Sequence, residues 1–170
     1  MKESPYLDGR EELLPRMLEL PSLSGFTEGH LRDIMRLSKV RSYEPGEVIL
    51  RQGQFDCWVY ILISGSARVV RDGREVAKLQ RSGELFGEMG VISGESRSAD
   101  VIAEKPATCL AVDGSVFERK TDGDSLTMMA LFFRLFAEVL AGRLRETNEE
   151  LVRVKKERDR LKNKLASLDI

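Results

Sequence analysis

The chain has 170 residues, 42% of them hydrophobic and 32% charged, and its 27 Lys and Arg nearly balance 28 Asp and Glu, for a formal net charge of -1. This length suits one domain with an appendage, and the even balance argues against sequence-independent nucleic-acid binding, which needs a concentrated excess of cations. The longest run without a charge, 57–67, is too short for a membrane helix of roughly 17 to 25 apolar residues, and the charged N-terminus argues against a signal peptide.

Residues 1–39 are predicted to form N-terminal helices. The first is marked by an apolar stripe that ends at Pro21, and its members are Leu13, Leu14, Met17, Leu18 and Leu20. The second is expected to start after Thr27 as its N-cap. His30, the single histidine, is expected at the surface of this second helix. One histidine leaves most histidine-based metal and acid–base chemistry out of reach, so no metal site is predicted.

Residues 40–120 are predicted to form an antiparallel β-roll, a cupin-like jelly roll. Short β-branched or aromatic runs alternate with glycine and turn residues, at 47–50, 58–63, 67–70, 75–79, 100–103 and 108–112. Many short strands at this spacing are typical of a sandwich or barrel. Asp72-Gly73 between two of the runs is a hairpin signal. Cys57 and Cys109 lie in apolar runs, so we expect buried thiols and a reducing, cytoplasmic compartment.

Residues 121–170 are predicted to form one long helix that starts at Asp124 or Ser125 and runs for about 45 residues. Apolar residues follow one seam with heptad spacing, at positions 126, 130, 133, 137, 140, 144, 151, 154, 161, 165 and 168. A seam this regular predicts a coiled coil. Glu150 facing Lys155, and Glu157 facing Lys162, favour a parallel, in-register homodimer. The alternative is an amphipathic helix that folds back on its own domain.

The segment 152–165 of this helix is rich in basic residues, with seven basic and two acidic side chains. Such a cluster could contact an acidic partner or a nucleic acid. A solvated face of the coil is the favoured interpretation, and a binding role is left open.

The stretch 85–99 carries the residues suited to ligand chemistry. Gly87 and Gly90 permit a close approach between backbone and ligand, and a helical turn from Glu88 would offer N–H groups to an anion. Arg97 can hold a phosphate through two hydrogen bonds. A carboxylate such as Glu88 repels phosphate, so it fits a ligand that also offers a hydroxyl donor, such as a ribose. The alternative is a surface Glu–Arg ion pair that braces a loop.

The motif Phe86-Gly87-Glu88-Met89-Gly90, followed by Arg97-Ser98-Ala99, resembles the phosphate-binding cassette of cyclic-nucleotide-binding domains. Catabolite activator protein and the regulatory subunits of cAMP-dependent kinases share this domain. The likeness covers about residues 13–150 and includes Pro45-Gly46 and Ser64-Gly65; Ser96 departs from it, because many members have proline there.

The resemblance implies a role for each residue of the cassette. Arg97 would bind the cyclic phosphate, and Glu88 would accept a hydrogen bond from the ribose 2′-OH. The remaining predicted ligand-binding residues of the β-roll are Gly87, Met89, Gly90, Ser98, Ala99 and Val69.

The long helix is expected to complete the site. Its segment 143–148 resembles the central helix of catabolite activator protein. This likeness implies that Thr147 contacts the base from its own subunit and that Asn148 of the partner subunit contacts it from the other side, while Arg143 braces Glu88. The alternative for Thr147, a polar seam residue, is that it only sets the register of the coil.

Together these features predict a dimeric cyclic-nucleotide sensor, not an enzyme, that signals through its coiled coil to a protein effector. The favoured ligand is cAMP, with cGMP or a cyclic dinucleotide as open alternatives, and no cofactor is expected. Because the heptads run to Ile170, no helix-turn-helix domain is expected after them. Two rival hypotheses are a coiled-coil scaffold with a vestigial nucleotide pocket and a DNA-binding regulator that acts through the basic coil.

Overall fold

The computed structural model describes residues 1–115 and 123–167, with side chains of the second range from Leu126 onwards. The chain divides into two units, Met1–Leu131 and Phe132–Ile170. The boundary between them falls inside the long helix α4, Gly123–Ala166.

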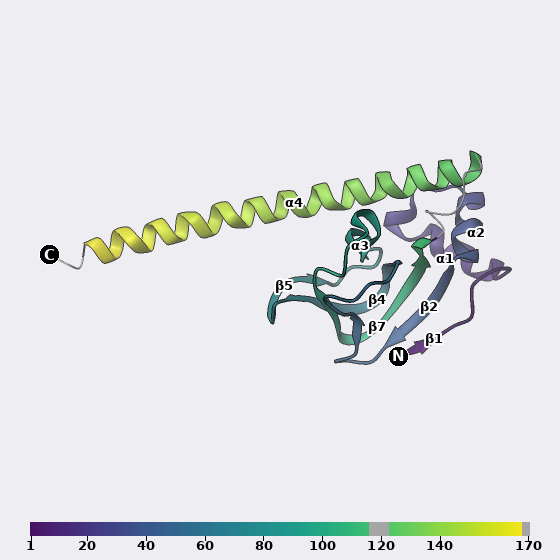
Figure 1. The fold of residues 1–170 in the computed structure, drawn as a ribbon, viewed down its shortest axis with the longest axis horizontal. Coiled ribbons are helices and arrows are strands. Elements are labelled where there is room, and N and C mark those ends of the chain that lie inside the picture. Colours follow the sequence, from purple (N-terminus) through teal and green to yellow (C-terminus); the bar gives the residue numbers. More distant parts are fainter. Residues whose placement is uncertain (116–122, 168–170) are drawn as a thin grey trace. The chain divides into compact units, whose positions relative to one another are not determined.

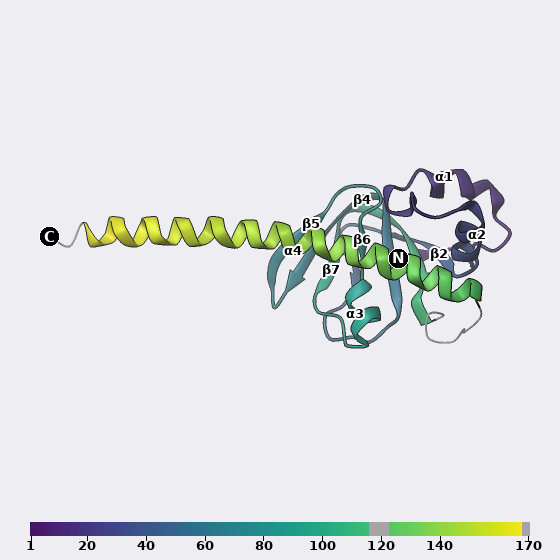
Figure 2. The same ribbon diagram turned by 90° about the horizontal axis from the view of Figure 1, so that it is seen from above.

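Within the described residues, the first unit is built on one antiparallel sheet of seven strands (Figures 1 and 2). The strands are β1 Lys2–Glu3, β2 Ser38–Tyr43, β3 Val48–Leu50, β4 Trp58–Arg71, β5 Arg74–Leu79, β6 Leu85–Phe86 and β7 Asp100–Asp113. Their order is β1-β2-β7-β4-β5, with β3 paired to β7 and β6 paired to β4. The predicted antiparallel β-roll is confirmed, and Asp72-Gly73 is the two-residue turn between β4 and β5.

The two longest strands, β4 and β7, bend where Gly65 meets Pro106. Their register shifts between Leu62 and Ala67. Gly65 has φ +90°, and a Cβ atom on it would lie 2.1 Å from the carbonyl oxygen of Pro106. Proline lacks an N–H group, and such irregular points of a sheet tolerate it. The runs that the sequence suggested as four separate strands are therefore two continuous, bent strands.

A hydrophobic core fills the inside of the roll. Its buried members are Tyr43, Ile49, Leu50, Tyr60, Leu62, Ala67, Leu79, Phe86, Val101, Ala103, Ala107, Cys109 and Ala111. The rings of Tyr60 and Phe86 stack with their centroids 5.2 Å apart. Burial raises the pKa of the Cys109 thiol to about 12, so this thiol stays protonated. The expectation for Cys57 was wrong: it is exposed, because it precedes the first residue of β4.

The N-terminal helices within 1–39 are short, and strand β1 and the first residues of β2 lie in the same range. The helical segments are the 3-10 turns η1 (Glu11–Leu13) and η2 (Pro21–Leu23) and the helices α1 (Leu14–Leu18) and α2 (Glu28–Arg36). Thr27 is confirmed as the N-cap of α2, and its hydroxyl accepts a hydrogen bond from the backbone of His30. Both views place α1 and α2 far from β5 (Figures 1 and 2).

Helix α4 has 44 residues and confirms the expected long helix. Large apolar seam residues are exposed along it, at Leu126, Phe133, Leu144, Leu151, Val154, Leu161 and Leu165. The helix begins at Gly123, before the predicted start at Asp124 or Ser125. The side chains of those two residues and the seam residue Leu168 lie outside the described residues. In the part of the chain that the structure describes, no helix is long and apolar enough to cross a membrane.

Replacing Gly65 with alanine is expected to destabilise the roll strongly. The new Cβ would clash with Pro106, and we expect a loss of about 3 kcal/mol or more in the free energy of unfolding. Gly46→Ala is the matched control, because Gly46 also has a positive φ, +86°, with no described atom within 4 Å of its Cβ position. It should lose about 1 kcal/mol. Equal losses in denaturant unfolding would contradict the proposed clash.

Candidate functional site

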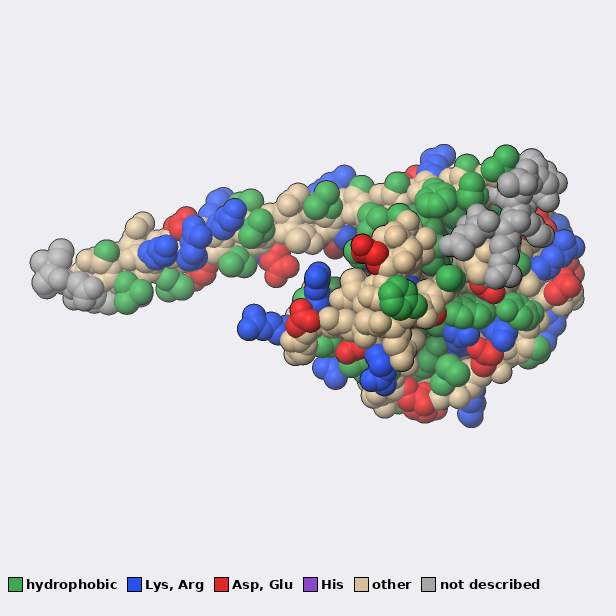
Figure 3. Space-filling model, viewed as in Figure 1, with side chains coloured by type: hydrophobic (Ala, Val, Ile, Leu, Met, Phe, Trp, Pro, Cys, Tyr) green, Lys and Arg blue, Asp and Glu red, His purple; other side chains and the backbone are tan. Residues whose placement is uncertain are grey.

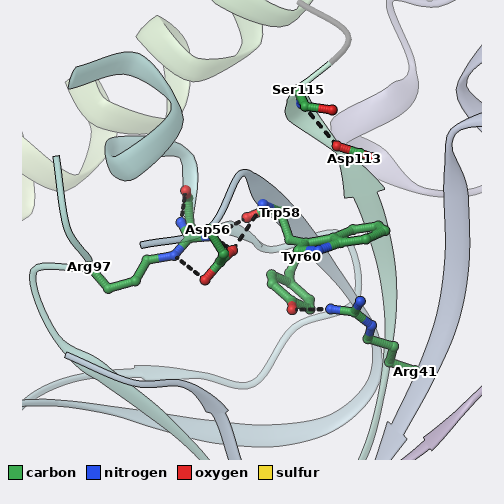
Figure 4. A network of polar contacts seen from close by, with 8 residues as sticks. Arg41, Asp56, Trp58, Tyr60, Arg97, Asp113 and Ser115 are labelled. Atoms are coloured by element: carbon green, nitrogen blue, oxygen red, sulfur yellow. Dashed lines mark hydrogen bonds and ion pairs between the residues drawn. The ribbon is translucent and has the colours of Figure 1, made fainter. Parts of the chain in front are cut away.

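The Arg97 guanidinium is buried between three segments of the first unit, with 4% of the residue exposed. Its Nε donates to Asp56 Oδ2 at 3.1 Å, and its Nη2 donates to Asp56 Oδ1 and to the carbonyl of Trp58. Its Nη1 donates to the carbonyl of Gly87 (Figure 4). A guanidinium has five N–H donors, so these bonds, counted among the described residues, leave one Nη1 hydrogen for another acceptor.

The backbone on both sides of Arg97 fixes this position. The Arg97 N–H donates to the carbonyl of Gln54, and the Gly53 N–H donates to the carbonyl of Arg97, both at 2.8 Å. The loop before β4 and the end of the cassette are therefore paired like two short strands.

The two cassette glycines make room for the guanidinium. A Cβ atom on Gly87 or on Gly90 would lie 3.1 Å from Arg97 Nη1. Gly87 also has φ +86°, at the start of α3 (Glu88–Ser93). The sequence suggested that these glycines permit close approach of a ligand, whereas the structure shows them packed against the arginine.

Glu88 lies in the first turn of α3 and is 1% exposed. Since both Glu88 and Arg97 are buried, the alternative of a surface ion pair between them is wrong. Beside them, Met89 is half exposed and its sulfur lies 3.9 Å from the hydroxyl of Ser98. A buried carboxylate and a buried guanidinium thus lie close to an exposed hydroxyl, which suits a ligand with both an anion and a hydroxyl group.

A pocket of about 590 Å³ opens beside Arg97. Its walls are Gln52, Gly53 and Phe55 before β4, Arg71 at the end of β4, and the loop 94–98. Of the predicted residues, Arg97 and Ser98 line this pocket, whereas Glu88 and the cassette glycines lie outside its lining.

The other predicted residues fall into two groups. Val69 on β4 pairs with Val101 on β7, two residues after Ala99, so both belong to the first unit near the cassette. Arg143, Thr147 and Asn148 belong to the second unit, on α4, and their roles stay predictions.

Asp56, which pairs with the buried arginine, was not predicted from the sequence. Arg71 and Gln52, which line the pocket, were not predicted either. Asp56 had no distinguishing signal, since it is one of 28 acidic residues and lies far from Arg97 in the chain. Arg71 could have been suspected, because it lies two residues after Val69 and strand side chains alternate between faces.

Trp58 connects this site to a second cation inside the roll. Its ring lies 4.1 Å from the guanidinium carbon of Arg41, and Arg41 donates to the phenol of Tyr60 (Figure 4). Burial raises the pKa of Tyr60 above its usual value, although Arg41 acts in the opposite direction. The phenol therefore stays neutral and accepts a bond from a permanent cation.

Residues 40–124 match the family described as cyclic nucleotide-binding domain. The chain is 38% identical over 93 residues to a cGMP-dependent protein kinase of Eimeria tenella, which covers 55% of this chain and 9% of the kinase. It is 28% identical over 111 residues to a cAMP-dependent protein kinase regulatory subunit of Schizosaccharomyces pombe, covering 65% of this chain and 27% of that protein. The chain thus spans less than a third of either relative.

Two solved structures share the fold. A cyclic nucleotide-binding domain from Methylobacillus flagellatus has a TM-score of 0.74 and 17% identity, covering 87% of each chain. The catabolite activator protein of Thermus thermophilus has a TM-score of 0.62 and 29% identity, covering 77% of this chain and 61% of that one.

Neutralising Asp56 tests how much its carboxylate stabilises the buried Arg97 guanidinium. Asp56→Asn leaves a buried guanidinium without its carboxylate, and because the Asp56 side chain is 32% exposed, we expect a loss of about 2 kcal/mol in the free energy of unfolding, less than for a fully buried pair. Asp33→Asn is the matched control, since Asp33 pairs with Arg36 at the surface; its loss should stay below about 0.5 kcal/mol. Similar small losses in both variants would contradict the assigned dependence.

Proposed function

The chain belongs to the cyclic nucleotide-binding domain family, and we propose that it binds a cyclic nucleotide, with cAMP preferred over cGMP, at the cassette of α3 and Arg97. The observation that carries this proposal is the buried Arg97, which lines a pocket together with Ser98. Arg97 binds the cyclic phosphate, Ser98 donates to it, and Glu88 accepts from the ribose 2′-OH. Relatives named for both cAMP and cGMP support the ligand class rather than the base.

Phosphate binding competes with an existing contact. Arg97 is held by Asp56 and by two carbonyls, and one Nη1 hydrogen remains for a ligand. A phosphate that draws more of the guanidinium toward itself weakens the bond to Asp56. Asp56 also accepts from the Trp58 N–H at 2.9 Å, so the start of β4 responds to the ligand.

The proposed output is a change in protein partners, not catalysis. We propose that the chain acts as a regulatory module and dimerises through α4. Its two free cysteines support the proposed cytoplasmic location, where thiols stay reduced.

Nucleotide titration tests the ligand assignment. We expect calorimetry to show saturable binding of cAMP, with weaker binding of cGMP. Arg97→Lys keeps the charge but loses the planar fork, so affinity should fall about 100-fold, whereas Arg81→Lys at an exposed loop should leave it unchanged. An absence of heat with both nucleotides at high micromolar concentration would falsify the assignment.

A second variant, Glu88→Gln, tests the ligand assignment independently if Arg97→Lys fails to fold. Glu88→Gln should weaken cAMP binding about 10-fold by removing the charged acceptor of the 2′-OH, and should leave the weaker binding of 2′-deoxy-cAMP unchanged. An equal loss for both ligands would contradict the ribose contact, and circular dichroism checks the fold of each variant.

The dimer proposal is supported by the exposed seam of α4. Leu144, Leu151, Val154, Leu161 and Leu165 are each between 48% and 65% exposed in the single chain. Figure 3 shows hydrophobic and basic side chains together along this helix. An isolated helix with so much exposed apolar surface gains stability by pairing.

Two neighbouring substitutions separate the seam from the outer face. Leu151→Asp places a charge in the seam and should raise the dimer dissociation constant at least about 100-fold in sedimentation velocity. Val152→Asp makes the same chemical change one residue along, at a side chain that is 52% exposed but outside the seam. It should leave the dimer intact, and equal effects of the two variants would contradict the heptad assignment.

Orientation is tested by oxidation. With Cys57→Ser in place, Leu161→Cys should form a disulfide between two subunits only where residue 161 of each faces the other, as in a parallel, in-register coil. A dimer that forms without this disulfide would contradict the parallel arrangement.

A further inference from the structure

The pocket beside Arg97 is lined by a second arginine, Arg71. Arg71 is the last residue of β4, two positions after Val69 and four after Ala67. Ala67 is a member of the core of the roll and Val69 packs against that core. The register of β4 with β5 shifts between Val69 and Val70, and Arg71 follows this shift and lines the pocket.

A glutamine connects the hairpin of Arg71 to the loop that holds Arg97. Gln52 Nε2 donates to Asp72 Oδ1 at 2.7 Å, and Gln52 Oε1 accepts from the Asp72 N–H at 3.1 Å. The next residue, Gly53, donates its N–H to the carbonyl of Arg97 at 2.8 Å. Two adjacent residues therefore hold the turn after Arg71 on one side and the backbone of Arg97 on the other, so the hairpin turn is tied to the cassette.

The negative charges at the site favour a second cation beside Arg97. Arg97 is already paired with Asp56, and Glu95 lines the pocket as a second carboxylate. A phosphate diester adds a further negative charge. Arg71 is 64% exposed, and its ion pair with Asp72 is long, at 3.9 Å. Its guanidinium can turn toward a phosphate without breaking a strong contact.

We propose that Arg71 is a second phosphate-binding residue of the pocket, which Gln52 positions through Asp72. This inference rests on the proposed function, because the phosphate is that of the cyclic nucleotide. Arg71 donates to an oxygen of the phosphate that faces solvent, while Arg97 donates from the buried side. The pocket then balances its carboxylates with two cations rather than one.

The test compares Arg71→Gln with Arg74→Gln in the full chain, by calorimetric titration with cAMP. Arg74 is paired with Arg71 across the hairpin and starts β5, but it does not line the pocket. The two variants therefore change the net charge equally. We expect Arg71→Gln to weaken cAMP binding about 5- to 10-fold at low salt, with a smaller difference at high salt. Arg74→Gln should change it less than 2-fold, and Arg71→Lys should restore part of the loss.

The positioning role of Gln52 has its own readout. Gln52→Ala should weaken cAMP binding when Arg71 is present and have no further effect in the Arg71→Gln background.

Failure of this inference is distinguishable from failure of the proposed function. Equal affinities of Arg71→Gln and Arg74→Gln, in a protein whose wild type binds cAMP, overturn the role of Arg71 alone. A wild type that binds neither cAMP nor cGMP overturns both. Thermal melting of each variant confirms that the hairpin remains folded.

Discussion

The burial of one guanidinium controls the arrangement of the first unit around the pocket. A charged group inside a protein is costly unless it is paired and hydrogen-bonded. Arg97 meets this requirement only where Asp56, the Trp58 carbonyl and the Gly87 carbonyl converge. The loop before β4, the start of β4 and the cassette must therefore be in place together. Any ligand that competes for the guanidinium changes contacts in all of these segments at once.

The same constraint explains which residues of the candidate site could be predicted from the sequence. The cassette is a contiguous pattern, so Glu88 and Arg97 could be selected as candidates from spacing and from family resemblance. Asp56 was not, because its pairing with Arg97 depends on how the loop before β4 returns to the cassette. In the fold Gly87 and Gly90 pack against the Arg97 side chain, and their role toward a ligand stays a prediction.

For the fold, segments with a periodic hydrophobic pattern were predicted well, but the connections between them were not. The alternating runs located β3, β4, β5 and β7, and the heptads located α4, whereas β2 and β6 were not predicted. The continuity of β4 and of β7 was missed because the short segments between the runs were interpreted as breaks, whereas Gly65 and Pro106 meet there within two continuous strands. Strand β1, Lys2–Glu3, has no apolar pattern at all. It depends on long-range contacts, since Glu3 binds Lys39 at 2.8 Å and Arg41 at 2.6 Å.

The position of β7 between other strands of the sheet affects how the chain folds during synthesis. This strand, the last one among the described residues, pairs with β2, β3 and β4. Ser38, for example, lies opposite Val112. Pairings between such distant residues slow folding, to about milliseconds to seconds in proteins dominated by them. During synthesis on the ribosome, β2, β3 and β4 lack their β7 partner until residues 100–113 have emerged. Nascent chains that stop before this point expose three strand edges to other chains, so the aggregation risk of this protein is concentrated in the short interval before β7 is complete.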